Sequence, residues 1–448
     1  MISIFKKWKK GSVLLTDAVW GDSGKGKCAS ALIPDISAKI IGGHNAGHTV
    51  VTDKYSIGLG LIPSTVIYPK TINIIGQEVV INPFFLVNEI SSLKKLGINL
   101  NSKNLLIDLN SHIILPWHEI RDALSEESRG KAAIGSLHLG VGWAYSDRVN
   151  RRGLRIQDLV TNNWKERILE ELKIQNGVIE DMKQDVKRKT GKESTLKTSI
   201  NKNELINNLI KVRNILKKYS TNTVSFIWNA IDKEKKILFE DSHGAMLEIS
   251  HGSWPYTTGV NTALGAVHRS FGGKAIKSIA KTVISVKSYQ TRVGGGPLPT
   301  ENNKNLGKYL QEKGGEFGTR SGRARRCGPI DLPALKYGLN IIGAQNKDEI
   351  ALTKLDVLTG LKEIPVCIAY SYKGKAYQIP LTMNAEFLEK VKPVYKIFPG
   401  WNNDITKINS FSNLPREAQK YVEFIEKSLD IPITMIGTGK NKDAVILR

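Results

Sequence analysis

A glycine-rich turn near the start of the chain combines one acidic and two basic side chains. Residues 19–28 read VWGDSGKGKC and follow a short apolar run. The glycines allow backbone N–H groups to approach an anion closely, and the N-terminus of a following helix adds partial positive charge. Lys25 or Lys27 can reach phosphate oxygens, and Asp22 can bind Mg²⁺ or act as a base. Cys28 stands where the usual phosphate-binding pattern has a magnesium-binding hydroxyl, so another group must replace it.

Two further short motifs have side chains that could take part in acid/base chemistry or in ligand binding. Residues 42–49 read GGHNAGHT, in which two histidines four positions apart suggest acid/base work or metal binding. Residues 353–356 read TKLD at the end of an expected strand. A carboxylate there can accept hydrogen bonds from N1–H and the 2-amino group of guanine, while a lysine stem lies along the face of the base.

The composition points to a reducing compartment. The chain has 448 residues, of which 41% are hydrophobic, and only three cysteines without a Cys-x-x-Cys pair. This argues against disulfides and against a structural zinc site. No apolar run is long enough to span a membrane, and residues 1–10 lack the apolar centre of a secretory signal. We expect a cytoplasmic protein whose residues 1–10 form a basic, frayed extension.

The formal net charge of +23 is the most unusual global property. It is compatible with nucleic-acid binding, with polyanionic small substrates, or with compositional drift toward lysine. The lysines are spread along the chain among many glutamates, and no aromatic-rich RNA-binding motif accompanies them. We therefore expect small anionic substrates, and neither a nucleic-acid nor a membrane partner.

Short apolar strands alternate with amphipathic stretches, which predicts an α/β fold with a large, mostly parallel central sheet flanked by helices. Helices are expected from about residue 25, near 84–96 and near 117–128. Residues 162–220 are lysine-rich with a helical period, and we interpret them as a peripheral helical excursion from a single domain spanning 1–448. The expected strands are residues 12–19, 38–41, 71–75, 105–109, 283–286, 350–355 and 366–370.

The chain resembles the adenylosuccinate synthetase family through motifs that run in family order along nearly its whole length. The resemblance implies an adenylosuccinate synthetase-like fold with a P-loop-like glycine loop. It implies a homodimeric, GTP- and Mg²⁺-dependent ligase that phosphorylates O6 of IMP and displaces the phosphate with the amine of L-aspartate. The matching motifs are WGDSGKGK (20–27), GGHNAGHT (42–49), VNRRGLR (149–155), HGSWPYTT (251–258), TRVGGGPLPTE (291–301), GEFGTRSGRARRCG (315–328), TKLDVLTGL (353–361) and FPGW (398–401).

The resemblance also implies roles for individual residues. Asp22 matches the base and, with the carbonyl of Gly47, the Mg²⁺ ligand; His48 matches the acid and Lys25 the loop lysine on the transferred phosphoryl group. The expected GTP site comprises Gly21, Ser23, Gly24, Lys25, Gly26, Lys27, Lys354, Asp356, Gly437 and Gly439. The expected acceptor site comprises Asn45, Leu137, Arg151, His243, Thr258 and Arg325, with Arg151 reaching across the dimer to the partner's site. The expected amine-donor site comprises Thr319, Arg320, Ser321 and Arg323.

Several positions depart from the family pattern, mostly on the acceptor and amine side. Leucines at 137 and 139 replace polar residues, His243 replaces a glutamine, and Arg320 replaces a threonine; Ser23 follows the loop aspartate in place of glutamate. Two alternatives to the family reaction therefore remain at this point. One is a specialised ligase of the same mechanism that uses another nucleotide acceptor or amine donor, in a phage or in secondary metabolism. The other is a nucleotide-binding homologue without ligase activity.

Overall fold

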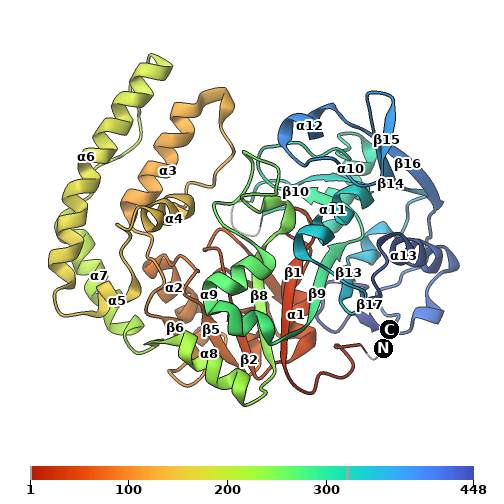
Figure 1. The fold of residues 1–448 in the computed structure, drawn as a ribbon, viewed down its shortest axis with the longest axis horizontal. Helices are drawn as coiled ribbons and strands as arrows, with labels where there is room; N and C mark the ends of the chain where they lie inside the picture. Colours follow the sequence, from red (N-terminus) through yellow and green to blue (C-terminus); the bar gives the residue numbers. More distant parts are fainter. Residues whose placement is uncertain (1–2, 319–321) are drawn as a thin grey trace.

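The structure is a computed structural model that describes residues 3–318 and 322–448, and a ten-stranded sheet runs through its centre (Figure 1). All neighbouring strands pair in parallel except β17 (Ile433–Gly437) and β18 (Val445–Leu447) at one edge of the sheet, which pair antiparallel. The expected α/β fold with a mostly parallel sheet is confirmed. The strand order is β18 (Val445–Leu447), β17 (Ile433–Gly437), β13 (Glu349–Thr353), β9 (Ile279–Lys287), β1 (Ser12–Asp17), β8 (Ile237–Gly244), β2 (Ile36–Lys39), β5 (Ile72–Ile75), β6 (Leu105–Asp108) and β7 (Ser220–Thr221).

The middle strand β1 is buried along its whole length because helices cover both faces of the sheet. Successive side chains of a strand point to opposite faces. Leu15 accordingly packs with residues of α1 (Lys25–Leu32), whereas Leu14 packs in the core that includes α9 (Ala263–Lys277). Strands buried on both sides are typical of parallel α/β sheets and explain the continuous apolar run in the sequence.

The expected helices are present with recognisable start signals. In α2 (Pro83–Lys95), the Asn82 side chain accepts a hydrogen bond from the backbone N–H of Phe85, and proline occupies the first turn. The next helix, α3 (Pro116–Arg129), also begins with proline. The expected strand at residues 366–370 exists as part of β14 (Glu363–Tyr372), but it belongs to a separate small sheet with β12 (Ile330–Asp331), β15 (Lys375–Tyr377) and β16 (Lys392–Pro399).

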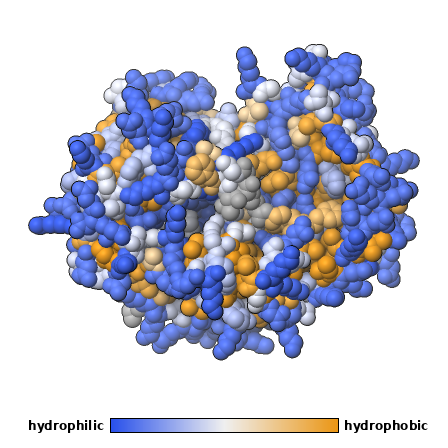
Figure 2. Space-filling model, turned by 180° about the vertical axis from the view of Figure 1, so that it is seen from behind, coloured by the Kyte–Doolittle hydropathy of each residue, from blue (hydrophilic) through white to orange (hydrophobic). Residues whose placement is uncertain are grey.

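The lysine-rich stretch 162–220 forms two long helices at one edge of the molecule (Figure 1). These are α6 (Trp164–Thr190) and α7 (Lys202–Leu216), and α6 packs against α3. Their buried residues join the hydrophobic cluster of the β5–β6 side of the sheet. On the face of the whole molecule opposite to the view of Figure 1, hydrophilic side chains protrude over most of the surface (Figure 2). No helix within 3–318 or 322–448 is long and apolar enough to cross a membrane.

Residues 3–10 are anchored to the sheet, so the expectation of a frayed extension is wrong for them. Glu349, buried in β13, accepts hydrogen bonds from the Ser3 hydroxyl at 2.9 Å and from the backbone N–H of Ile4 at 2.9 Å. The same carboxylate accepts from Thr434 at 2.6 Å and pairs with Lys281. One buried charge therefore ties the start of the chain to three strands, close to the C-terminus (Figure 1).

We predict that Glu349→Ala lowers the unfolding midpoint in urea. Removing one partner of a buried ion pair costs about 3 kcal/mol because the other charge is left without compensation. Lys10→Ala is the matched control, since it removes an ion pair with Glu234 that is exposed on both sides, and its midpoint should stay at the wild-type value. Equal midpoints for all three proteins would show that Glu349 does not anchor the N-terminal segment.

Candidate active site

Two adjacent chambers open at the carboxyl ends of the central strands, where ligands bind in open α/β sheets. The first chamber has a volume of about 490 Å³ and is lined by the glycine-rich loop, residues 45–49, Lys354 and Asp356. The second chamber has a volume of about 460 Å³ and is lined by parts of α3, residues 134–137 and residues 256–259. Residues that line both are Asn45, Leu137, His243, Leu247 and Val293.

The backbone of the loop after β1 follows a path that only certain residues allow. Gly24 has a φ of +91° and caps α1, and Asp22 has a φ of +56° in the same left-handed region. A Cβ on Gly26 would lie 2.7 Å from the carbonyl oxygen of Thr49, so a side chain there would force the loop away from the neighbouring strand. This path directs Asp22, which is partly exposed, to the first chamber.

The two loop lysines have different surroundings. The ammonium group of Lys25 is buried in the wall of the first chamber, 3.3 Å from the carbonyl oxygen of His243 and 3.9 Å from a carboxylate oxygen of Asp17. Lys27 instead donates to three carbonyl oxygens of the C-terminal loop, those of Gly439 (2.6 Å), Asn441 (2.8 Å) and Ala444 (2.8 Å). Burial lowers the pKa of Lys27 to about 8. Lys25 is therefore the lysine placed to meet a phosphate, and Lys27 holds the segment that carries Gly439.

His48 is oriented by a buried carboxylate. Its Nδ1 contacts Glu240 of β8, which also accepts from the hydroxyl (2.6 Å) and the backbone N–H (3.0 Å) of Ser64. Among the described residues, Nε2 of His48 is buried without a hydrogen-bond partner. Burial lowers the pKa of His48, whereas burial of Glu240 is outweighed by the bond to His48, which keeps the pKa of Glu240 low. The other histidine of the motif, His44, stacks on Phe85 at 5.0 Å between ring centroids.

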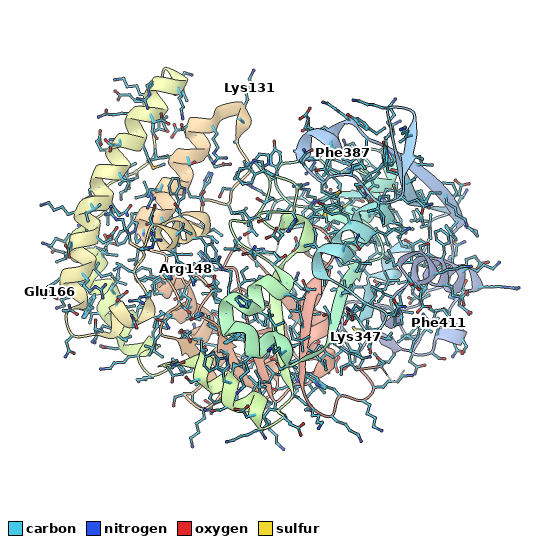
Figure 3. All side chains as sticks on the ribbon, viewed as in Figure 1. Lys131, Arg148, Glu166, Lys347, Phe387 and Phe411 are labelled. Atoms are coloured by element: carbon cyan, nitrogen blue, oxygen red, sulfur yellow. The ribbon has the colours of Figure 1, made fainter. Side chains whose placement is uncertain are left out.

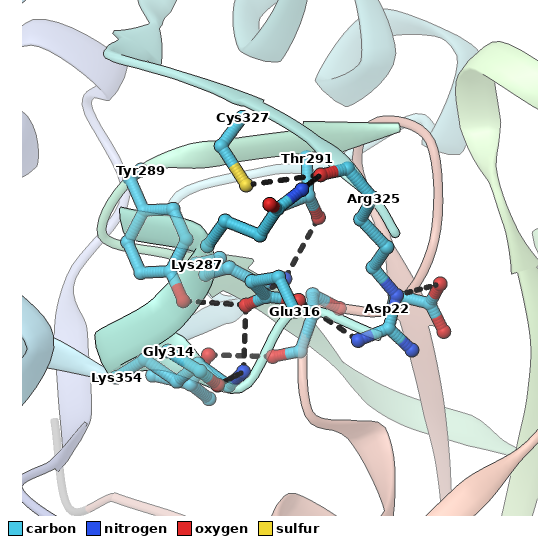
Figure 4. A network of polar contacts seen from close by, with 12 residues as sticks. Asp22, Lys287, Tyr289, Thr291, Gly314, Glu316, Arg325, Cys327 and Lys354 are labelled. Atoms are coloured by element: carbon cyan, nitrogen blue, oxygen red, sulfur yellow. Dashed lines mark hydrogen bonds and ion pairs between the residues drawn. The ribbon is translucent and has the colours of Figure 1, made fainter. Parts of the chain in front are cut away.

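Asp356 and Lys354 form the opposite end of the first chamber. One carboxylate oxygen of Asp356 is buried and has no hydrogen-bond partner within the described part of the chain, and burial raises the pKa of this group. The ammonium group of Lys354 donates to the carbonyl oxygen of Gly314 (2.9 Å) and to Glu316 (2.6 Å), as Figure 4 shows. The charged end of Lys354 is thus already engaged, which leaves its aliphatic stem and Asp356 to contact a ligand.

A guanidinium group joins the loop aspartate to the same buried carboxylate. Arg325 donates from Nε to Asp22 at 2.9 Å and from Nη1 to Glu316 at 2.8 Å (Figure 4). Burial would lower the pKa of Arg325, but the two carboxylates raise it above its ordinary value. Neither Glu316 nor Glu240 was expected from the sequence. His48, the partner of Glu240, lies 192 positions away, and the partners of Glu316 come from three separate segments.

The wall between the chambers contains polar atoms that lack strong partners. The side-chain oxygen of Asn45 is buried with no hydrogen bond to any described residue, and Nε2 of His243 lies 3.5 Å from the hydroxyl of Thr258. Burial, helped by the charge of Lys25, lowers the pKa of His243 to about 3. His243 is therefore a neutral imidazole, with one donor and one acceptor nitrogen, at neutral pH.

The loop that carries Leu137 is fixed by carboxylates of α3. Glu126 accepts hydrogen bonds from three consecutive backbone N–H groups, those of Ile134 (3.3 Å), Gly135 (2.7 Å) and Ser136 (3.0 Å). Lys131, at the tip between α3 and this loop, points away from the molecule (Figure 3). The loop also contacts Arg323 of the expected amine-donor site, which donates to the carbonyl oxygen of Gly135 at 3.2 Å.

Some expected site residues lie outside the chambers or outside the described residues. Arg151 is exposed just after α4 (Val141–Val149), with a φ of +60°, and lines neither chamber, whereas Arg148 of α4 lies within the molecule and pairs with Glu78 (Figure 3). Gly437 ends β17 beside Thr353. Thr319, Arg320 and Ser321 lie outside the described residues, so the structure says nothing about their expected role.

The described residues contain no group of three or more histidine, cysteine, aspartate or glutamate side chains arranged to hold a metal ion. Asp22 of the glycine-rich loop and Gly47 nevertheless line the first chamber together. Mg²⁺ is commonly held by one or two carboxylates together with phosphate oxygens of the substrate and water. One carboxylate and one carbonyl in this chamber fit that kind of site.

Comparisons with known proteins agree along the whole chain. A family model described as adenylosuccinate synthetase matches residues 14–446. The adenylosuccinate synthetase of Halothermothrix orenii is 38% identical over 445 residues, covering 98% of this chain and 99% of the relative. The adenylosuccinate synthetase of Streptomyces coelicolor is 37% identical over 437 residues, covering 97% and 98%.

Solved structures give the same result. The fully ligated adenylosuccinate synthetase of Plasmodium falciparum has a TM-score of 0.89 with 34% identity, covering 97% of this chain and 99% of that one. The succinoaminodeoxyadenylate synthetase of cyanophage S-2L, bound to dGMP and dATP, has a TM-score of 0.59 and covers 98% and 95%. At 17% identity, this second likeness shows a shared fold alone.

The low pKa of His243 predicts how acid affects stability. The unfolded chain binds a proton at this imidazole below its ordinary pKa of 6.5, while the folded chain does so only near 3. Stability is therefore lost as pH falls below 6.5, and at pH 5 this one group costs about 2 kcal/mol.

His243→Gln should accordingly lose less thermal stability than the wild type between pH 7.5 and pH 5. His138→Gln, which replaces an exposed histidine, serves as the control and should follow the wild type. An identical loss of melting temperature in all three proteins would contradict the neutral, buried state of His243.

Proposed function

Because this chain belongs to the adenylosuccinate synthetase family, a family of GTP-dependent ligases, we propose that it forms adenylosuccinate from IMP and L-aspartate. In this reaction GTP first phosphorylates O6 of IMP, and the aspartate amine then displaces phosphate at C6. The observation that carries the proposal is a single chamber lined by Asp22, Lys25, His48 and Asp356. These are the groups that phosphoryl transfer from a guanine nucleotide requires.

Asp22 is the proposed base. The O6 oxygen of a 6-oxopurine is amide-like and a poor leaving group, and it becomes nucleophilic when N1 loses its proton. A carboxylate on a strained, partly exposed turn can take that proton, provided that one of its oxygens is not occupied by the hydrogen bond from Arg325. Phosphorylation then converts O6 into a good leaving group, and the aspartate amine forms the new C–N bond as phosphate departs.

His48 and Lys25 are proposed to stabilise the transferred phosphoryl group. In the structure as described, burial favours neutral His48, with its Nδ1 proton on the Glu240 side. A polyphosphate beside the free Nε2 favours the charged imidazole, because nearby negative charge raises a histidine pKa. Both ring nitrogens then donate, one to Glu240 and one to a phosphoryl oxygen. The ammonium of Lys25 adds a second positive charge.

Guanine recognition is proposed for Asp356, Lys354 and the C-terminal loop. The unpartnered oxygen of Asp356 can accept from N1–H and the 2-amino group of guanine, while adenine lacks both donors. Lys27 fixes the loop that contains Gly439, which brings its backbone to the same chamber.

Mg²⁺ is proposed to bind Asp22 and the Gly47 carbonyl, and when bound it neutralises charge on the β- and γ-phosphates.

The acceptor nucleotide is proposed to occupy the second chamber, near Asn45, His243 and Thr258. The relatives named adenylosuccinate synthetase match at 34–38% identity over nearly the whole chain, so an altered acceptor or amine donor is not favoured. Loss of ligase activity is not favoured either. We read Leu137 and His243 as variation that the family reaction tolerates. Neutral His243 can still form one hydrogen bond with the O6/N1 edge of a purine, as donor or as acceptor according to its tautomer.

We further propose that the enzyme is a cytoplasmic homodimer. Exposed Arg151, which lines neither chamber of its own chain, would then reach the acceptor phosphate in the partner's site. Arg323, together with Thr319, Arg320 and Ser321, remains the proposed contact for the carboxylates of aspartate, which suit the planar donor fork of arginine.

The reaction itself is tested by phosphate release from GTP with Mg²⁺, IMP and L-aspartate, with the product identified by mass spectrometry. We predict adenylosuccinate, with an absolute requirement for both IMP and aspartate. GMP, dGMP and XMP replace IMP in parallel reactions. Turnover with one of these acceptors and none with IMP would contradict the proposal.

Asp356→Asn tests the choice of phosphoryl donor. The amide presents an NH₂ group where the carboxylate accepted a hydrogen bond, so it opposes the 2-amino group of guanine but suits the 2-oxo group of xanthine. We predict that the KM for GTP rises about 100-fold, which corresponds to the loss of two charge-assisted hydrogen bonds, and that XTP becomes the better donor.

The control for this experiment is Asp443→Asn, at a nearby exposed aspartate that pairs with Lys442. Its preference for GTP should equal that of the wild type. An unchanged ratio of GTP to XTP use in Asp356→Asn would show that Asp356 does not contact the base.

A further inference from the structure

Glu316 lies at the centre of a buried polar network next to the first chamber (Figure 4). It follows α10 (Asn305–Gly314) and is fully buried. One carboxylate oxygen accepts from Lys287 (2.9 Å), Lys354 (2.6 Å) and the hydroxyl of Tyr289, and the other accepts from Arg325 (2.8 Å). The four donors come from the end of β9, from the turn after β13 and from the segment before β11 (Arg326–Gly328).

The partners of Glu316 connect this network to the first chamber, because Lys354 and Arg325 both line it. Glu316 contacts all three of Lys287, Lys354 and Arg325, and Asp22 contacts Arg325 on its other side. Within these five side chains, three cations face two anions. A buried ion pair is weak evidence for stability by itself. What the ion pairs of Glu316 do is fix the directions of Lys354 and Arg325.

Two of the three cations that Glu316 holds, Lys354 and Arg325, each have a second role. Lys354 directs its ammonium to Glu316 and Gly314, which keeps its stem in the wall of the chamber near Asp356. Arg325 divides its guanidinium between Glu316 and Asp22. Glu316 therefore sets the position of two side chains. One is Lys354, beside the proposed site for the donor's base, and the other is Arg325, which holds Asp22.

We propose that Glu316 is a positioning residue that fixes the base-binding end and the reacting end of the first chamber together. It touches neither substrate and acts through Lys354 on one side and through Arg325 and Asp22 on the other. This inference rests on the proposed function, because it takes the chamber to be the GTP site. It also predicts a specific pattern. Lys354 lies at the base-binding end, whereas Arg325 was expected to contact the acceptor and holds Asp22, so loss of Glu316 must affect the donor and the acceptor together.

Glu316→Gln is the test, because it keeps the shape and removes the charge. We expect the KM values for GTP and for IMP each to rise about tenfold or more, and kcat to fall, as Lys354 and Arg325 lose a charge-assisted partner. Glu301→Gln is the matched control, since it removes a partly exposed carboxylate from Arg326, the neighbour of Arg325. Its KM values should stay within about twofold of the wild type.

Tyr289→Phe keeps the test decisive if Glu316→Gln does not fold. It removes one hydrogen bond to Glu316 and leaves the ring in place, so both KM values should rise about fivefold. A residue that only stabilises the fold would lower the melting temperature and leave both KM values unchanged. That result, or a change confined to one substrate, would overturn the proposal.

Direct binding separates this inference from the proposed function. Fluorescent N-methylanthraniloyl-GTP and calorimetry with IMP measure affinity without turnover. If the wild type binds both ligands but forms no adenylosuccinate, the proposed function fails while Glu316 can still be tested. Weaker binding of both ligands to Glu316→Gln would then support its positioning role, and equal binding would overturn it.

Discussion

The parallel pairing of β1 with both β8 and β9 is the constraint on which the whole site depends. In this register Leu15 lies opposite Glu240, and Asp17 lies opposite both Gly244 and Ser285. The loop that follows β1 therefore leaves the sheet at the same edge as the ends of β8 and β9. A shift of that register would move the glycine-rich loop away from Glu240, the carboxylate that orients His48.

The carboxylates of the site divide into two kinds. Glu240 and Glu316 are fully buried and occupied by neighbouring side chains, so they orient His48 in one case and Lys354 with Arg325 in the other. Asp22 and Asp356 line the first chamber, and each can exchange bonds with a ligand. The buried pair supplies geometry and the pair that lines the chamber supplies chemistry. This division explains how carboxylates can serve as scaffold in the two glutamates, and as the proposed proton acceptor and guanine-recognition group in the two aspartates.

Much of this arrangement could be predicted from the sequence, and the rest depended on contacts between distant segments. The apolar run of β1, the glycines of the loop and the start of α1 carry local signals, and the spaced motifs indicated the family. By contrast, the pairing of His48 with Glu240 joins residues 192 positions apart, and no local pattern encodes it. Lys27 was expected to contact GTP, yet its ammonium holds the C-terminal loop, because only the folded chain brings those carbonyls together. The N-terminal segment was misjudged for the same reason, since its anchor lies in β13.

The central claim is that O6 of the acceptor is phosphorylated before the amine attacks C6. The most direct test follows oxygen, with IMP labelled by ¹⁸O at position 6 and incubated with GTP, Mg²⁺ and L-aspartate. If Asp22 activates O6 and His48 and Lys25 support transfer to it, each inorganic phosphate released contains one ¹⁸O atom and the adenylosuccinate contains none from that position. Unlabelled phosphate, with the label released to water or retained in the nucleotide, would contradict the account.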